Sequence, residues 1–161
     1  MKRNNFLNKM KAKGKLELVE PSEDISNSYL EKSENCLESA RLLRDNNLYE
    51  NSISMSYYSM YNSLTALLFR TGIKCENHSA SILLLKLLFN KSNLFKSISD
   101  AKEERIDRQY YVTEEDKLTK EIVKELLKNA EEFVVKIRLL IKNLSNDSIT
   151  KIRKKFEELT G

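Results

Sequence analysis

The chain has 161 residues, of which 40% are hydrophobic, and it carries a formal net charge of +4 with a single histidine. At roughly 100–200 residues per domain, this length predicts one domain with a core of useful size. Three glycines and one proline are too few for the tight turns of a many-stranded β protein, and the hydrophobic content excludes a disordered chain. We therefore expect an all-α fold.

The positive charge belongs to the two ends of the chain. Residues 1–15 hold six basic residues and no acid, and residues 150–161 hold four bases and two acids. Residues 16–149 hold 18 bases and 22 acids, so the body is mildly acidic. Basic ends attract nucleic acid or anionic lipid without specificity, but solvated tails are the simpler expectation. The first fifteen residues lack the apolar core of a signal peptide, so we expect a cytoplasmic protein.

The first two bundle helices are marked by their end signals. Ser22 can cap a helix that runs to about Asn46, and the acids after it favour the positive end of the helix dipole. A second helix is expected from about Leu48 to Arg70, with Gly72 in the left-handed conformation just beyond its end. The expected buried stripe of the first helix comprises Ile25, Tyr29, Cys36, Ala40 and Leu43.

The second helix contains an uncharged stretch, residues 51–69, that is long enough to span a membrane. Eight of these nineteen residues are Ser, Asn or Thr, which is a poor composition for a lipid-facing helix. A buried bundle helix with small packing residues fits better, and we expect no transmembrane segment.

Further helices follow in the second half. A third helix is expected from Asn77 or His78, then a connection over 91–98 that could contain a short turn of helix, and then a helical segment over 99–112. The longest helix is expected over about 114–145, and a final helix over about 147–159. The expected apolar seam of the long helix comprises Ile122, Leu126, Ala130, Phe133, Ile137, Leu140 and Leu144, and that of the final helix comprises Ile149, Ile152, Phe156 and Leu159.

Short connections between amphipathic helices predict an up-and-down antiparallel helical bundle of about four to five main helices with short extra helices. No strand is expected. We divide the chain into a basic N-terminal segment (1–21), the bundle (22–145) and a short C-terminal helix (146–161). Cys36 and Cys75 have no metal-type spacing, so we expect free thiols, no metal site and no cofactor.

Three features carry candidate chemistry. On the second helix, Tyr58, Tyr61 and Asn62 lie three to four residues apart and share one face. That face forms either a satisfied polar core or the wall of a polar cleft. Within 105–111, Arg105 suits bidentate phosphate contact and a nearby Tyr110 or Tyr111 could stack on a base, unless Asp107 pairs with an arginine in a charged turn. His78, at the start of the third helix, is expected to be structural or to line a cleft.

The order and spacing of these residues resemble the HEPN domain. The similarity rests on Tyr57-Tyr58-Ser59-Met60-Tyr61-Asn62-Ser63, then on Ala66-Leu67-Leu68-Phe69, Gly72-Ile73-Lys74 and His78-Ser79. The stretch 105–111 and the long closing helix with Ala130 and Phe133-Val134 also fit, and the resemblance covers roughly residues 22–145. It implies a helical bundle that is usually a homodimer, often encoded beside a minimal nucleotidyltransferase in a pair that resembles a toxin–antitoxin module.

Nuclease members of that family carry an arginine followed a few residues later by a histidine. Here Arg105 matches the arginine, but Tyr110 or Tyr111 stands at the histidine position, and His78 matches a different family histidine. A tyrosine with its ordinary pKa of about 10 is a poor base at neutral pH. Some family members receive a nucleotide on a tyrosine just past the histidine, a place that Val112 occupies if Tyr110 takes the histidine position.

The leading hypothesis is therefore a dimeric partner of a nucleotidyltransferase that binds nucleotide or RNA in a polar cleft. The residues expected to line that cleft are Tyr58, Tyr61, Asn62, Arg105, Asp107 and Tyr110. A metal-independent endoribonuclease toxin is the first alternative, with Arg105, Tyr110 and His78 as candidate catalytic residues. A non-specific RNA or membrane-surface binder working through the basic ends is the second.

Overall fold

The computed structural model describes residues 2–110 and 116–161, with side chains described over 5–108 and 119–161. Within these ranges the chain forms seven helices and one two-stranded sheet, which confirms the expected all-α bundle. In chain order they are α1 (Lys2–Ala12), β1 (Leu16–Leu18), α2 (Glu23–Asp45), α3 (Tyr49–Arg70), β2 (Ile73–Cys75), α4 (His78–Leu87), α5 (Ser92–Tyr110), α6 (Asp116–Lys142) and α7 (Asn146–Thr160).

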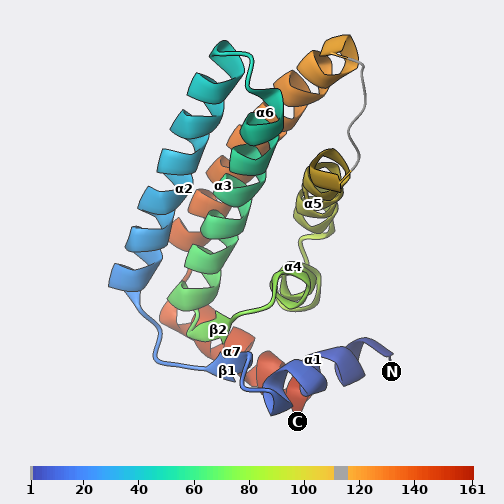
Figure 1. Ribbon diagram of the computed structural model, residues 1–161. Coiled ribbons are helices and arrows are strands. Elements are labelled where there is room, and N and C mark those ends of the chain that lie inside the picture. Colours follow the sequence, from blue (N-terminus) through green and yellow to red (C-terminus); the bar gives the residue numbers. More distant parts are fainter. Residues whose placement is uncertain (1, 111–115) are drawn as a thin grey trace.

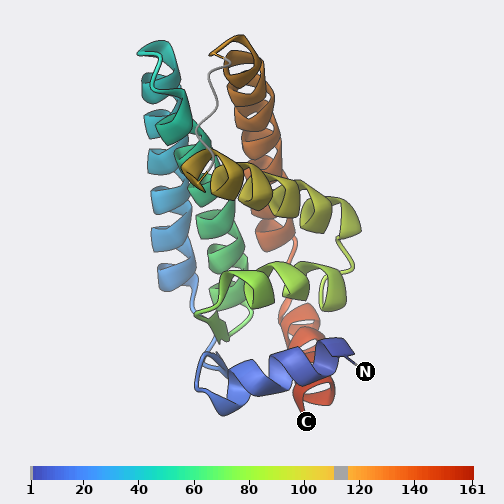
Figure 2. The ribbon, with the colours of Figure 1, turned by 45° about the vertical axis from the view of Figure 1, so that its right-hand side comes forward.

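Three long helices, α2, α3 and α6, stand side by side and enclose the main core (Figure 1). Helices α4 and α5 lie across α3 rather than along it, and α1, α7 and the small sheet form the base of the molecule (Figure 2). The described helices that cover α3 therefore come from both halves of the chain.

Local capping explains where several helices begin and end. The Ser22 hydroxyl accepts a hydrogen bond from the backbone of Ile25 at the start of α2, as expected. Asn77 caps α4 in the same way by accepting from the backbone of Ala80. Gly72 has a φ of +74° just beyond α3, so the expected left-handed residue is confirmed.

The uncharged stretch of α3 is buried, as predicted. The buried serines of α3 include Ser52, whose hydroxyl donates to the carbonyl of Ala40 on α2 at 2.7 Å. From the opposite side, Ser33 of α2 donates to the carbonyl of Ser59 at 2.7 Å. Small side chains let the two backbones approach closely while each of these hydroxyls finds an acceptor. Among the described residues, no helix is long and apolar enough to cross a membrane.

Of the expected stripe of α2, Ala40 is buried as predicted, whereas Ile25, Tyr29 and Cys36 each lie one residue before a buried position. Ile25 is 42% exposed, whereas the buried positions are Ser26, Leu30, Ser33, Leu37 and Ala40. The reason is the serine contact with α3, which turns the small polar residues of α2 inward. A search for apolar spacing alone does not detect such a seam.

Two further expectations are wrong because long-range packing overrides the local signal. Residues 91–98 are not a connection: α5 begins at Ser92, because Leu94, Ile98 and Ala101 form a buried stripe. Strands β1 and β2 pair antiparallel with Leu16 opposite Cys75 and Leu18 opposite Ile73. Each strand has three residues, too few to show an alternating pattern.

The basic N-terminal residues are not a solvated tail. Helix α1 buries Leu7 and Met10 in the core, and Lys11 Nζ donates to the carbonyl of Thr160 on α7 at 3.2 Å. The two ends of the chain therefore meet at the base of the molecule (Figure 1). The division of the chain at 21/22 and 145/146 remains a prediction.

Arg153 of α7 connects separate segments at the base of the molecule through hydrogen bonds. Arg153 Nη1 donates to the carbonyls of Val19 at 2.7 Å and Gly72 at 2.9 Å. A Cβ atom at position 72 would collide with this guanidinium group and with the carbonyl oxygen of Val19. Gly72 is thus required both by its backbone conformation and by the close approach of Arg153.

We predict that Gly72→Ala lowers the free energy of unfolding by about 3 kcal/mol, because it adds backbone strain and displaces Arg153. Gly14→Ala is the matched control: Gly14 has a φ of +67° but open space around the Cβ position, so a decrease of about 1 kcal/mol is expected. Urea unfolding followed by circular dichroism measures both. Equal decreases would contradict the role given to Arg153.

Candidate functional site

A compact polar cluster lies where α4 and α5 cross α3. Helix α3 contributes Tyr57, Tyr58 and Tyr61, the first residue of α4 is His78, and α5 contributes Lys102 and Arg105. Tyr57 and Tyr61 face the same way because they are one helical turn apart. We call these six residues the α3–α5 cluster.

His78 is held on two sides by tyrosines. The Tyr57 hydroxyl and His78 Nδ1 are 2.7 Å apart, and the ring of Tyr61 stacks on the imidazole with a centroid distance of 3.8 Å and an interplanar angle of 17°. Tyr57 is fully buried, so the orientation of the imidazole is fixed by packing as well as by the hydrogen bond.

The charge state of this pair follows from its surroundings. Burial lowers the pKa of His78, and the nearby cations Lys102 and Arg105 lower it further, so the imidazole is neutral at pH 7. Burial raises the pKa of the Tyr57 hydroxyl far above its usual value, so Tyr57 remains protonated.

The tautomer of His78 decides what the ring offers a ligand. The acceptor within hydrogen-bonding distance of the buried Tyr57 hydroxyl is His78 Nδ1, which favours Tyr57 as the donor. The imidazole proton is then on Nε2, and the ring donates a hydrogen bond there. The reverse tautomer would make Nε2 a proton acceptor instead.

Arg105 lies against the aromatic side of the cluster. Its guanidinium carbon is 5.2 Å from the ring centroid of Tyr57 and 5.5 Å from that of Tyr58. These cation–π contacts hold the guanidinium against the two rings, and a guanidinium is chemically suited to bidentate contacts with a phosphate or carboxylate. The contact also explains why an arginine rather than a lysine suits this position.

Lys102 adds a second cation one turn before Arg105. Its Nζ donates to the hydroxyl of Ser79, at the start of α4, at 2.6 Å. Burial lowers the pKa of Lys102, and the charge of Arg105 lowers it further. Two cations held this close together repel each other, and an anion placed between them would relieve that repulsion.

The structure brings together only some of the residues expected to line a cleft. Tyr58, Tyr61 and Arg105 belong to the cluster. Asn62 instead faces α2, where its Nδ2 lies 3.6 Å from Cys36 Sγ, and Asp107 is an exposed residue of α5.

The remaining predicted residues are at the end of α5. The side chain of Tyr110 lies outside the described residues, as do Tyr111 and Val112. The structure gives Arg108 an ion pair with Glu104 at 3.8 Å, one turn earlier on α5. The alternative prediction of a charged turn expected Asp107 to pair with an arginine. The acid that pairs with Arg108 is instead Glu104.

Sequence reasoning missed two members of the cluster. Tyr57 could have been found, because it is four residues before Tyr61 and therefore on the same face. Lys102 carried a weaker signal, since a lysine three residues before Arg105 is ordinary on an exposed helix. The hydrogen bond from Lys102 to Ser79 is apparent only once α5 packs against α4.

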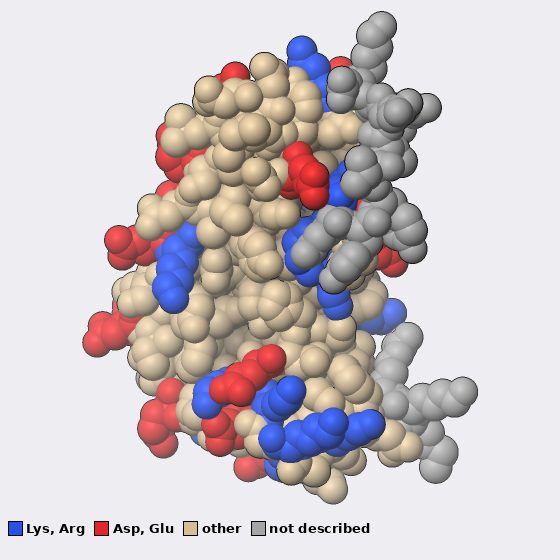
Figure 3. Space-filling view, viewed as in Figure 1, with Lys and Arg blue, Asp and Glu red and all other residues tan. Residues whose placement is uncertain are grey.

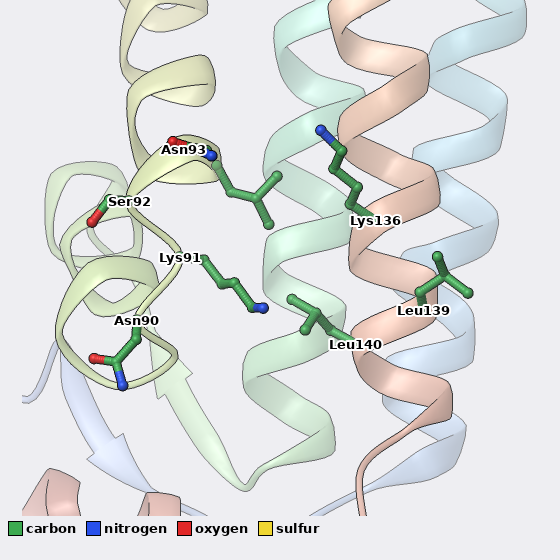
Figure 4. A pocket seen from close by; sticks show the side chains of 8 residues that line it. Asn90, Lys91, Ser92, Asn93, Lys136, Leu139 and Leu140 are labelled. Atoms are coloured by element: carbon green, nitrogen blue, oxygen red, sulfur yellow. The ribbon is translucent and has the colours of Figure 1, made fainter.

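The space-filling view shows basic side chains gathered over α5 (Figure 3). A separate groove of about 510 Å³ lies between the connection before α5 and helix α6 (Figure 4). It contains no member of the cluster, and its lining residues include Lys91, Lys136, Leu139 and Leu140. Over the described part of the chain, no group of three or more His, Cys, Asp or Glu residues could hold a metal ion.

A family model for the HEPN domain matches residues 26–159 of the chain. The match extends from α2 through α7 and includes every residue of the cluster. None of the curated proteins matches the chain.

We predict that replacing Lys102 by Gln raises the pKa of His78, because a nearby positive charge is removed. Since the folded protein binds this proton less readily than the unfolded chain, stability should fall as the pH is lowered through about 6.5 toward the folded pKa. Proton NMR reports this pKa directly, because His78 is the only histidine. Lys124→Gln, on the exposed face of α6, is the control, and equal pKa values in both variants would refute the coupling.

Proposed function

Since the chain belongs to the HEPN family, we propose that it is the HEPN partner of a minimal nucleotidyltransferase in a toxin–antitoxin-like module, and that its α3–α5 cluster binds the phosphate group of a nucleotide or RNA. The observation that carries the binding proposal is the cation–π contact of Arg105 with Tyr57 and Tyr58, beside the second cation Lys102. We expect the protein to act in the cytoplasm as a homodimer.

The chemistry of the cluster suits a phosphate monoester or diester. Arg105 provides a bidentate donor edge and Lys102 a compact charge, both able to form charge-assisted hydrogen bonds. His78 adds a neutral donor at Nε2 in the tautomer favoured by Tyr57. Tyr58, which is only partly buried, is positioned next to Arg105 and could stack on a base.

We predict that Arg105→Ala weakens the binding of AMP, ATP or a short RNA by about tenfold or more, since a hydrogen bond to a charged group is worth about 1.5–3 kcal/mol. Isothermal titration calorimetry at high protein concentration measures the affinity. Arg44→Ala removes an equivalent charge from the exposed end of α2 and should leave binding unchanged. The absence of heat with every one of these ligands and the unmodified protein would overturn the proposal.

A metal-independent endoribonuclease is a second candidate, because the structure places His78 beside Tyr57, which Arg105 also contacts. His78 and Arg105 are 27 positions apart in the sequence. In this reaction Nε2 of the reverse tautomer would take the proton of a ribose 2′-hydroxyl. The 2′-oxygen attacks the phosphorus, the bond to the 5′-oxygen breaks and that oxygen takes a proton from water, while Arg105 stabilises the charge on the phosphate. The products are a cyclic phosphate and a 5′-hydroxyl.

This candidate predicts that expression slows growth, and that Arg105→Ala and His78→Gln each restore it. Co-expression with the cognate nucleotidyltransferase should also restore growth and recover the two proteins as a complex. Growth curves measure the effect of expression, with equal protein levels confirmed by immunoblot. RNA cleavage assays in EDTA measure the activity without metal ions. Identical growth for the unmodified protein and both variants would contradict the proposed ribonuclease activity. Failure of the two proteins to co-purify would contradict the proposed partnership with a nucleotidyltransferase.

A further inference from the structure

Helix α1 and the turn after it present four lysines that the α3–α5 cluster does not use. Lys9, Lys11, Lys13 and Lys15 are all exposed, and the first acid of the chain is Glu17. We call these residues the α1 lysine cluster. They belong to a packed segment, because Lys11 is bonded to Thr160 and the apolar residues of α1 are buried.

Two acids of the neighbouring sheet are engaged elsewhere, because Glu17 and Glu76 both pair with Lys74, at 3.3 and 3.1 Å. Among the described residues, Lys9, Lys13 and Lys15 form no ion pair, whereas Lys11 is hydrogen-bonded to Thr160. An array of lysines over a short distance matches a polyanion better than it matches a single small anion.

The packing of α1 favours a nucleic acid over a lipid surface. A helix that lies in a membrane interface needs an exposed apolar face beside its basic face. In α1, Leu7 and Met10 are buried in the core, and Phe6 packs against it. Among the α1 side chains that the structure describes, the exposed ones are polar or basic apart from Ala12, so α1 offers electrostatic contact rather than an apolar face.

The two basic regions lie on one side of the molecule. Helices α5, α4 and α1 follow one another down the same face (Figure 2), and α4 contacts both of the other two. In the space-filling view, basic side chains gather over α5 and again over the base, where acidic side chains lie beside them, with a mostly uncharged surface between the two regions (Figure 3). A flexible polyanion crossing α4 would reach both.

We propose that the α1 lysine cluster is a second contact for the phosphate backbone of a single-stranded nucleic acid whose other contact is the α3–α5 cluster. This proposal rests on the proposed function, since that cluster supplies the first contact. It identifies the ligand as an oligonucleotide that crosses α4, rather than a mononucleotide.

The test compares short and long oligonucleotides by fluorescence anisotropy. The variant is Lys9→Gln, Lys13→Gln and Lys15→Gln together, which spares the Lys11 hydrogen bond to Thr160. The control is Lys120→Gln, Lys124→Gln and Lys128→Gln, three exposed lysines of α6 with the same change in charge. The probes are labelled RNAs of about four and about 20 nucleotides, which bracket a short and an extended footprint.

The α1 variant should bind the long RNA about tenfold more weakly at low salt. Its affinity should also depend less steeply on salt, by about 0.7 in the log–log slope for each phosphate that a lysine no longer neutralises. The short RNA should bind all three proteins equally, and the control should match the unmodified protein. An equal effect of both variants on the long RNA would overturn the inference. A DNA strand of the same sequence shows whether the sugar contributes.

Two further outcomes separate the sites. If Arg105→Ala leaves both RNAs bound while the α1 variant releases the long one, the proposed function fails and the α1 surface acts alone, which overturns the two-contact footprint. If the α1 variant is impaired only on vesicles containing phosphatidylserine and not on RNA, the ligand of this surface is a membrane and the inference is wrong. Circular dichroism melting confirms that each variant is folded.

Discussion

Helix α3 carries no charged side chain from Asn51 to Phe69, and the architecture depends on covering every face of it. Helix α2 packs on one side through serine-to-carbonyl hydrogen bonds, and α6 packs on another with large apolar residues such as Phe133 and Ile137. The remaining face receives α4, α5 and β2. Exposing such a helix to water would leave a long apolar surface uncovered.

The polar cluster is a consequence of that burial. The tyrosines of α3 face α4 and α5, so their hydroxyls need partners from those helices. His78 forms a hydrogen bond with the Tyr57 hydroxyl, and Arg105 makes cation–π contacts with the rings of Tyr57 and Tyr58. Burial strengthens the hydrogen bond between Tyr57 and His78. The same burial lowers the pKa of the His78 imidazole and raises that of the Tyr57 hydroxyl, so both groups are neutral. The helix crossing that completes the core therefore also sets the protonation states of the candidate site.

At the base of the molecule, one side chain again serves several segments. Arg153 satisfies carbonyls at the end of α3 and at the start of the segment that leads into α2. This tie holds α7 against the small sheet, and α7 in turn packs against α1. The basic residues of the N-terminal segment are consequently displayed on a folded helix. Helix α1 thus presents its lysines in a defined arrangement, which a solvated tail would not do.

The helical class, most helix ends and the family resemblance were predictable from the amino-acid sequence alone. Apolar periodicity and caps such as Ser22 act within a few residues of each other and are readable without a fold. It also indicated Tyr58, Tyr61, His78 and Arg105 as residues of interest, and the spacing of Tyr57 was readable in the same way.

Which of these residues contact one another depends on how the helices pack. His78, Tyr57 and Lys102 come from three helices, and no local pattern records that α4 and α5 cross α3 at this point. The turn of Asn62 toward α2, the pairing of β1 with β2 and the burial of α1 have the same origin. Each depends on contacts between segments far apart in the chain, whose free energy comes from surfaces that do not exist until the helices pack.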